Sequence, residues 1–434
     1  MIATIIIASV TFLSIAISLF LFPKIKIGKI GISTYWVIAL VGAAVILIFQ
    51  LAPVTEVFKQ LTADTKINPM KILVLFFSMT LMSILLDEYG LFQYLANLAV
   101  KNAKGNQYAL FFSLYTLVAV LTVFTSNDVV ILTFTPFICF FCKRTRVNPL
   151  PYLIAEFAAA NTWSLMFLIG NPTNIFLSTT AGIDFINYLK VMWLPTIGAG
   201  LVELGIIFIL FRKMLNEKVT HIDEEVKVKG SRVMLIVGVI HLLVCLIFLI
   251  LASYINIEMW LIAAICSASL FLFTMLIALV RRKDWFFVEK ALKRLPYPLI
   301  PFFLSMFVIV VALNYQGITS EIAKLFGSQN AIWVYGYSSY LASNLINNIP
   351  MSILYSNLCS QLTEASYLPG VFASVIGSNL GAFLTPMGAL AGIMFTNLLN
   401  EHEVKFSFID FVKYGIIVSL PTITVALALL FVTI

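Results

Sequence analysis

Four short polar motifs interrupt the long apolar segments of this chain, two in each half. They occupy residues 126–128, 170–174, 343–350 and 377–386. Each combines asparagine with serine, glycine or proline, and several of these residues break helices or free backbone groups. Such groups are costly inside a bilayer unless they line a protected cavity. Paired interruptions at corresponding places in two halves indicate the binding site of a secondary transporter.

The composition places the rest of the chain in a membrane. Hydrophobic residues make up 61% and charged residues 11% of the sequence, and the mean hydropathy is +1.03. Soluble domains average about 45–50% apolar and about 25% charged residues. The formal charge of +7 does not indicate a nucleic-acid partner, because the basic residues are scattered among short loops. In membrane proteins such residues set the orientation.

Apolar segments near the ~20 residues that cross a bilayer recur five times in each half. They are 2–22, 34–53, 70–89, 151–180 and 187–211, then 232–254, 257–280, 297–316, 366–399 and 410–432. The segments 107–143 and 330–363 are each broken by a motif and are expected to be re-entrant hairpins. The sequence thus predicts an all-α polytopic membrane protein with two inverted-topology repeats, 1–211 and 232–434. Each repeat has a hairpin and a broken helix (151–180 or 366–399), and 212–231 is a cytoplasmic linker.

The lysines and arginines predict the orientation. With both hairpins counted as non-crossing and both termini extracytoplasmic, most of the 27 basic residues face the cytoplasm, as expected for a cell membrane protein. Only Lys59, Lys66, Lys71, Lys190 and Lys324 lie outside. Five crossings are an odd number, so the second repeat must be inverted relative to the first. A short similarity between residues 88–96 and 315–323 also indicates duplication.

Asp128 is the candidate for ion coupling. A carboxylate at membrane depth costs roughly 2.5–3.5 kcal/mol and normally faces a functional cavity. At a hairpin tip beside Ser126 and Asn127, it could bind a proton or Na⁺ and release it as access alternates. The alternative is a helix cap, because Asp readily caps the helix that returns from the tip.

The neutral residues of the motifs are the candidate substrate ligands. A proline at 172 frees a carbonyl, and a half-helix N-terminus attracts an anion or a polar hydroxyl; the alternative is a simple proline kink. The predicted substrate-binding residues are Ser126, Asn127, Asn171, Thr173, Asn174, Asn344, Asn347, Asn348, Ser378, Asn379 and Thr385. Weaker candidates are Asp87, Glu88 and Glu156, together with Glu203 and His241, which could pair with each other or with neighbours.

Several other classes of protein fit poorly. No nucleotide-binding loop or hydrolase motif occurs, and the three histidines show no metal-ligand spacing. We therefore expect no cofactor, no metal site and no enzymatic activity. The five cysteines lie in apolar segments and are expected to be packing residues, although Cys139 and Cys142 could bind a soft thiophile such as As(III).

The motifs resemble those of the arsenite/antimonite permease family, within the ion transporter superfamily that also holds dicarboxylate and Na⁺/H⁺ carriers. The similar stretches are 86–90, 126–128 with Pro136, 347–351, 373–381 and 385–391. The resemblance implies two inverted repeats with paired re-entrant hairpins, and proton-coupled export of arsenite or antimonite. The chain departs from that family at Asn379, where the permeases tend to carry a carboxylate. It also lacks the Ser-Asn-Thr signature of Na⁺-coupled dicarboxylate carriers in both tips.

The expected partners are the bilayer, a small inorganic or organic solute and H⁺ (or Na⁺); a homodimer and a soluble ATPase subunit stay open. The favoured mechanism is alternating access with proton-coupled arsenite export. The alternative within the same superfamily is Na⁺- or H⁺-coupled transport of an organic or inorganic anion similar to a dicarboxylate or citrate. A passive channel is a different class, which would dissipate gradients without counter-transport.

Overall fold

The computed structural model describes residues 1–434 apart from 23, 28–29, 64–67, 217–231 and 282–284. The described part is helical except for one short antiparallel pair of strands, β1 (Lys24–Ile27) and β2 (Ile30–Ser33). The helices of the first half are α1 (Ile2–Leu21), α2 (Thr34–Ile48), α3 (Val54–Thr62), α4 (Pro69–Glu88), α5 (Leu91–Ala103), α6 (Gln107–Phe124), α7 (Asn127–Thr145), α8 (Leu150–Trp163), η1 (Leu168–Gly170), α9 (Pro172–Thr180), α10 (Phe185–Phe211) and η2 (Met214–Asn216).

The second half repeats this order. Its helices are α11 (Arg232–Ile255), α12 (Met259–Arg281), α13 (Trp285–Arg294), α14 (Leu299–Tyr315), α15 (Ile318–Phe326), α16 (Ala331–Ile346), α17 (Asn348–Cys359), α18 (Glu364–Gly381), α19 (Leu390–Glu401) and α20 (Phe408–Thr433). Each of the ten α-helices of the first half therefore has a counterpart ten labels later, whereas the short helices η1 and η2 have none among the described residues. The short similarity seen in the sequence falls at one such pair, because Gly90 (φ 89°) precedes α5 and Gly317 (φ 74°) precedes α15.

The sequence starts these helices with local caps. The side chain of Asn68 accepts hydrogen bonds from backbone amides in the first turn of α4, and that of Asn106 does so for α6. Pro69 fits the first position of α4, because a backbone N–H there would have no partner within the helix. Ser407 and Asp410 form a capping box at the start of α20. Within the described residues, seven helical stretches are long and apolar enough to cross a membrane. The chain is a multi-pass membrane protein.

Counterpart helices make reciprocal contacts between the halves. Helix α4 packs on α12, and α14 packs on α2. Both pairs are parallel. The ends of α4 meet the same ends of α12 through Lys71–Glu258 and Tyr89–Thr274, and the ends of α14 meet those of α2 through Phe302–Tyr35 and Gln316–Leu51. Exchanging the two halves leaves this packing pattern unchanged.

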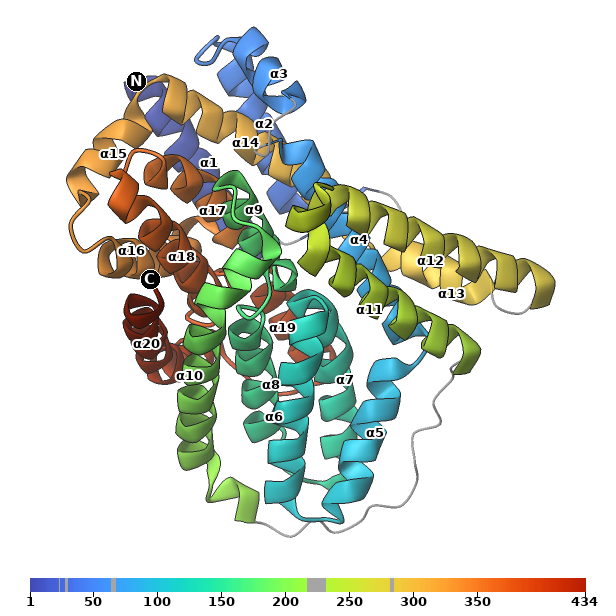
Figure 1. Ribbon diagram of the computed structural model, residues 1–434. Coiled ribbons are helices and arrows are strands. Elements are labelled where there is room, and N and C mark those ends of the chain that lie inside the picture. Colours follow the sequence, from blue (N-terminus) through green and yellow to red (C-terminus); the bar gives the residue numbers. More distant parts are fainter. Residues whose placement is uncertain (23, 28–29, 64–67, 217–231, 282–284) are drawn as a thin grey trace.

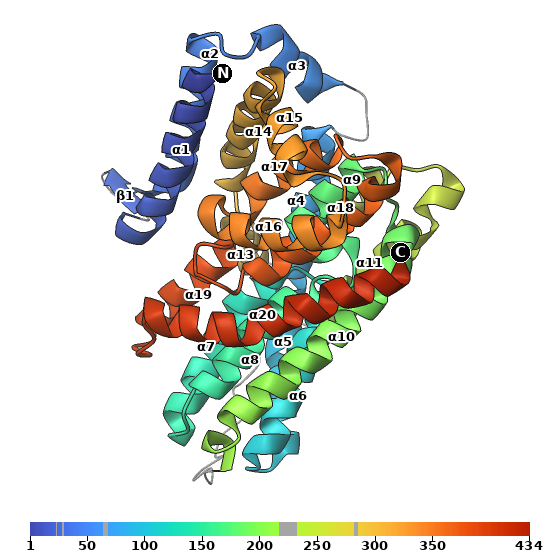
Figure 2. The same ribbon diagram turned by 90° about the vertical axis from the view of Figure 1, so that its left-hand side faces the viewer.

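Helices α10 and α20 pack on each other along their lengths and are antiparallel. Gly198, in the middle of α10, lies against Leu429 near the end of α20, whereas Phe211 at the end of α10 contacts Tyr414 near the start of α20. The two lie side by side in both views (Figures 1 and 2). An antiparallel pair of counterpart helices is the arrangement that an inverted repeat requires.

Each half also contains a helical hairpin packed on a broken helix. In the first, α6 runs parallel to α8, as the pairs Gln107–Tyr152 and Phe124–Phe167 show. Helix α7 returns antiparallel to α8, with Asn127 near Asn161 and Thr135 near Glu156. Helices α16 and α17 bear the same relation to α18. These hairpins coincide with the segments 107–143 and 330–363 that the sequence indicated.

The structure differs from the predicted spans in three details. The sequence reading missed the short helices α3, α5, α13 and α15, which are too short and too polar to register as spans. Ser378 and Asn379 lie inside α18, so the second break comes later, between Gly381 and Leu390. The predicted linker lies outside the described residues from 217 to 231.

Candidate functional site

The first hairpin tip is built by a break at Thr125 and Ser126. Asn127 begins α7, and its side chain accepts a hydrogen bond from the amide of Asp128 at 2.9 Å. The Asn127 amide nitrogen lies 3.4 Å from Asn161 Oδ1 of α8. The hydroxyl of Ser126 is buried and, among the described residues, has no hydrogen-bond partner.

Asp128 lies half-buried in the first turn of α7. Its carboxylate has no hydrogen-bond partner among the described residues, so it does not act as the cap that the sequence left open. Asp128 thus lies at the first hairpin tip beside Asn127, with a carboxylate that no described residue binds.

The first broken helix supplies three buried predicted ligands, Asn171, Thr173 and Asn174. Helix α8 stops at Trp163, η1 crosses the break, and α9 restarts with Pro172 at its first position. Asn171 caps α9 by accepting hydrogen bonds from the Thr173 amide (3.1 Å) and hydroxyl (3.0 Å). A simple proline kink would not need this cap. The α-helical conformation is interrupted over eight residues, 164–171, which include η1.

Five side chains from both halves form a continuous polar group, which we call the central amide cluster: Asn127, Asn161, Ser164, Asn174 and Asn379. Asn379 of α18 donates to Asn174 Oδ1 at 2.6 Å and accepts from the Ser164 hydroxyl at 2.8 Å. Asn174 donates in turn to the Ser164 carbonyl at 2.8 Å. The partners in this cluster are amides, a hydroxyl and backbone carbonyls, so the cluster is neutral.

The second hairpin tip is held in a strained conformation. Asn347 has φ 70° and ψ 153°, a region that is nearly exclusive to glycine and costs of order 1–3 kcal/mol. Three bonds offset the strain: Asn347 Nδ2 donates to the Met387 carbonyl at 3.1 Å, its Oδ1 accepts from Ile349 N, and the Asn348 amide donates to the Gly388 carbonyl. Strain held by its surroundings is frequent at functional sites.

Asn344 and Thr385 lock this tip to the second break. Asn344 accepts from the Thr385 hydroxyl at 2.7 Å and donates to the Gly381 carbonyl at 2.9 Å. The helices approach closely here, because a Cβ on Gly381 would lie only 2.6 Å from the Tyr340 carbonyl. We call Asn344, Asn347 and Thr385 the second-tip cluster.

Two predicted ligands, Ser126 and Ser378, have buried hydroxyl groups without a hydrogen-bond partner among the described residues. An unsatisfied buried hydroxyl costs about 1–3 kcal/mol. Such groups are expected where a polar solute or water binds during the cycle.

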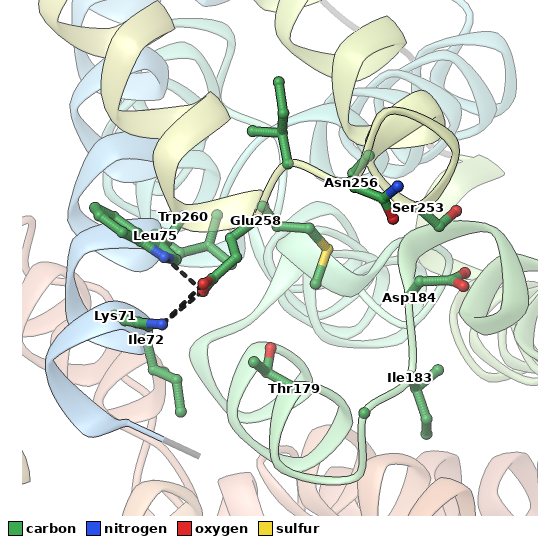
Figure 3. A pocket seen from close by; sticks show the side chains of 14 residues that line it. Lys71, Ile72, Leu75, Thr179, Ile183, Asp184, Ser253, Asn256, Glu258 and Trp260 are labelled. Carbon is green, nitrogen blue, oxygen red and sulfur yellow. Dashed lines mark hydrogen bonds and ion pairs between the residues drawn. The ribbon is translucent and has the colours of Figure 1, made fainter. Parts of the chain in front are cut away.

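Two cavities lie beyond the motifs rather than on them. One of about 280 Å³ is lined by polar residues of α9 and α17, including Thr180, Ser356 and Asn357. The other, of about 340 Å³, lies between the start of α4 and the loops before α10 and α12. Figure 3 shows Lys71 and Trp260 of this second cavity, both joined to Glu258. The predicted ligands line neither of these two cavities.

The weaker acidic candidates separate into distinct environments. Asp87 and Glu88 have buried side chains and form ion pairs with Arg294 at 2.7 and 2.6 Å. Glu156 accepts from the Thr135 hydroxyl. Of the two alternatives for Glu203 and His241, the structure shows pairing with neighbours: Glu203 binds Tyr115 and Thr162, whereas His241 bonds to Val237 and Ser269. The five cysteines are free.

Sequence reasoning missed Asn161 and Ser164, which complete the central amide cluster. Both precede the 170–174 motif inside an apolar span. The signal that could have found them is polarity itself, because Asn161, Thr162 and Ser164 are adjacent polar residues at membrane depth.

A protein family described as citrate transporter (CitMHS) matches residues 17–369. The chain belongs to this family. Its fold is similar to the crystal structure of the Alcanivorax borkumensis YdaH transporter, with a TM-score of 0.53 and 15% identity over 99% of this chain and 97% of that one.

Sequence relatives point to the same superfamily. The chain is 26% identical to the arsenical pump membrane protein of Escherichia coli K12, over 82% of this chain and 84% of that protein. It is 25% identical to a putative arsenical pump membrane protein of Bacillus subtilis, over 81% and 85%. The predicted likeness to arsenite permeases of the ion transporter superfamily is confirmed. The chain is a secondary transporter of a small solute.

Proposed function

We propose that this protein exports arsenite or antimonite in exchange for protons by alternating access. The solute would bind between the central amide cluster and the second-tip cluster, and Asp128 would carry the coupling proton. The observation that carries this proposal is the neutral cluster formed across the two halves, through Asn174 and Asn379. Arsenous acid is neutral near pH 7 and presents hydroxyls, which amides and serine hydroxyls can bind without a cation.

The repeat architecture supports alternating access. We propose that residues 1–211 and 232–434 are inverted repeats, each contributing a hairpin and a broken helix. Reciprocal contacts and the antiparallel α10–α20 pair are consistent with a two-fold axis in the membrane plane. Such symmetry lets a transporter open to either side around one site. The asymmetry of lysines and arginines further supports a plasma membrane protein with both termini outside.

A single proton supplies enough free energy for useful export. Its entry down about 100 mV releases about 2.3 kcal/mol, which sustains a solute gradient of roughly 40–50-fold. Asp128 is the acid best placed to carry that proton, because it lies at the tip beside Asn127 and its carboxylate is unpaired.

The test is uptake into everted vesicles, and into proteoliposomes of the purified chain alone, under an imposed proton or Na⁺ gradient. We expect arsenite to accumulate and the accumulation to collapse with a protonophore. Accumulation by the purified chain would also show that no ATPase subunit is required. Equilibration without accumulation would identify a channel instead.

The family to which the chain belongs favours a second candidate, transport of an organic anion coupled to Na⁺ or H⁺. The amides at the start of α9 and α17 follow the two asparagine caps, and helix N-termini attract anions. Labelled citrate and succinate in the same vesicles distinguish the two candidates. Na⁺-dependent flux of either anion, with no arsenite movement, would transfer the function to this alternative.

A further inference from the structure

Glu203 is an acidic residue inside a membrane-spanning helix that the proposed mechanism does not use. It lies in α10 and is 1% exposed. Ionisable residues at such depth are rare and usually functional. No ion pair to Glu203 occurs among the described residues, whose ion pairs involve other acids.

The carboxyl group joins three helices through hydroxyls. One oxygen accepts from Thr162 of α8, and the other lies 3.0 Å from the Tyr115 hydroxyl of α6. That hydroxyl lies 2.7 Å from the Gly200 carbonyl and accepts a hydrogen bond from Trp163 Nε1 at 3.1 Å. Glu203 thus connects α10 to the first hairpin and to the last turn of α8.

Proton positions in this network depend on the state of Glu203. Tyr115 has one hydroxyl hydrogen and two acceptors within reach, Gly200 O and Glu203 Oε1. When Glu203 is ionised, Tyr115 donates to it. When Glu203 is protonated, it donates to Tyr115, and the tyrosine hydrogen turns to the Gly200 carbonyl. The same heavy-atom geometry accommodates both states, so a proton can be gained and lost without breaking the network.

Few other groups could influence this site. Tyr115 is the titratable group that α6 presents to it, and α8 presents Thr162 and Trp163. Glu156 of α8 instead bonds to Thr135 of α7. On α20, the group Asp410, Lys413 and Tyr414 lies by Phe211, two turns further along α10. His241 of α11 bonds within its own helix and to Ser269 of α12.

The network leads directly to the central amide cluster. Thr162 follows Asn161, whose side chain contacts Asn127 at the first tip. Ser164 comes two residues after Thr162 and donates to Asn379 of the other half. A change in the hydrogen bond between Glu203 and Thr162 therefore acts on the turn that holds both ligands.

We propose that Glu203 is a second proton-binding group and acts as a positioning residue. Its protonation state determines the position of the last turn of α8, and through that turn the contact of the two halves at Asn379. Its binding of a proton stands apart from the solute, whereas its effect on coupling rests on the proposed proton-coupled transport.

The first test is infrared spectroscopy of the purified protein in lipid, titrated from about pH 5 to about pH 10. We expect a carbonyl band of a protonated carboxyl group that disappears as pH rises, is absent in Glu203→Gln and persists in Glu156→Gln. Tyr115→Phe should shift this band, because it removes the partner of Glu203. A Glu203 band unchanged over the whole range would overturn the proposal, since it would mark a permanently protonated structural group. This measurement needs no solute, so it stands even if arsenite is not transported.

The second test separates coupling from binding in proteoliposomes. Arsenite counterflow without a proton gradient should stay within about twofold of wild type in Glu203→Gln, while proton-driven accumulation falls by about tenfold or more. Glu203→Asp, which retains the acid, should restore part of the accumulation if the Gln variant folds poorly. Equal loss of counterflow and accumulation in a well-folded Glu203→Gln protein would contradict the coupling role.

Discussion

The two halves share an order of helices but differ in the chemistry placed inside the membrane. From α6 to α10 the first half carries Asp128, Glu156 and Glu203 within its helices, and Glu156 and Glu203 are buried. From α16 to α20 the acids of the second half are Glu364, Glu401, Glu403 and Asp410, all at helix ends. From the hairpin to the last helix, the first half thus carries acids buried inside its helices and the second half does not, and on that ground alone we call them the acidic half and the neutral half.

The neutral half is also the more tightly packed at its hairpin. Helices α16 and α18 approach through Gly336, Gly377 and Gly381, as small residues allow in membranes. The corresponding pair in the first half, α6 and α8, meets through large side chains such as Tyr115 and Trp163. We propose from this difference that the second half fixes the geometry of the site and the first half exchanges protons.

The largest effect is expected from a disruption of the tight half. Gly381→Leu places a side chain against the Ser343 hydroxyl and the Tyr340 carbonyl, and the carbonyl is backbone and cannot rotate away. Overpacking of this kind costs about 1–3 kcal/mol and sometimes more, so we expect loss of the monodisperse folded protein in size-exclusion chromatography. The matched control is Gly205→Ala in α10, where nothing lies within 4 Å, and it should fold normally. A well-folded, active Gly381→Leu protein would contradict the rigid role of the second half.

The next effect concerns the acidic half. Asp128→Asn removes the unpaired carboxyl group at the first tip while preserving its size. Proton-driven arsenite accumulation should fall from roughly 40–50-fold to no accumulation, with folding unchanged. Glu364→Gln, an exposed acid in the first turn of α18, is the control and should accumulate arsenite as wild type does. Undiminished coupled transport would remove Asp128 from the mechanism.

A smaller effect is expected where the halves meet. Asn379→Ala deletes the bonds to Asn174 and Ser164 and leaves both without this partner. Two lost hydrogen bonds correspond to about 1–3 kcal/mol, so we expect binding of solute about tenfold weaker, measured from the concentration dependence of counterflow. Asn379→Ser should retain part of the affinity. Unchanged affinity in Asn379→Ala would place the solute elsewhere.

The smallest effect is expected inside the second-tip cluster. Thr385→Val keeps the shape of the side chain but loses the hydrogen bond to Asn344 Oδ1 and the one that the hydroxyl accepts from the Met387 amide at 3.2 Å. Each such bond contributes about 1 kcal/mol, so thermal unfolding in detergent should occur slightly earlier and transport should change less than about fivefold. Asn344 keeps its bond to the Gly381 carbonyl, which limits the damage. A complete loss of transport would mean that Thr385 contacts the solute itself.

The sequence predicted the spans and motifs well because both depend on local properties. Runs of apolar residues located α10 and α20 to within about two residues, and paired asparagine motifs located both hairpin tips. What it could not predict was pairing across the molecule. The partner of Asn379 is 205 residues away, and Glu203 bonds to Tyr115 rather than His241 because α10 turns that face toward α6. Short amphipathic helices such as α5 were missed because they lie along the span ends.

The α10–α20 pair has a consequence for how the protein is made. Residues 212–407 are synthesised between the two helices, so α10 enters the membrane long before its partner exists. During that interval the surface of α10 that will contact α20 faces lipid or the insertion machinery. This surface includes Gly198, against which Leu429 later packs. The contact between α10 and α20 therefore forms last, and a ribosome stalled before residue 408 would leave an incomplete, degradation-prone intermediate.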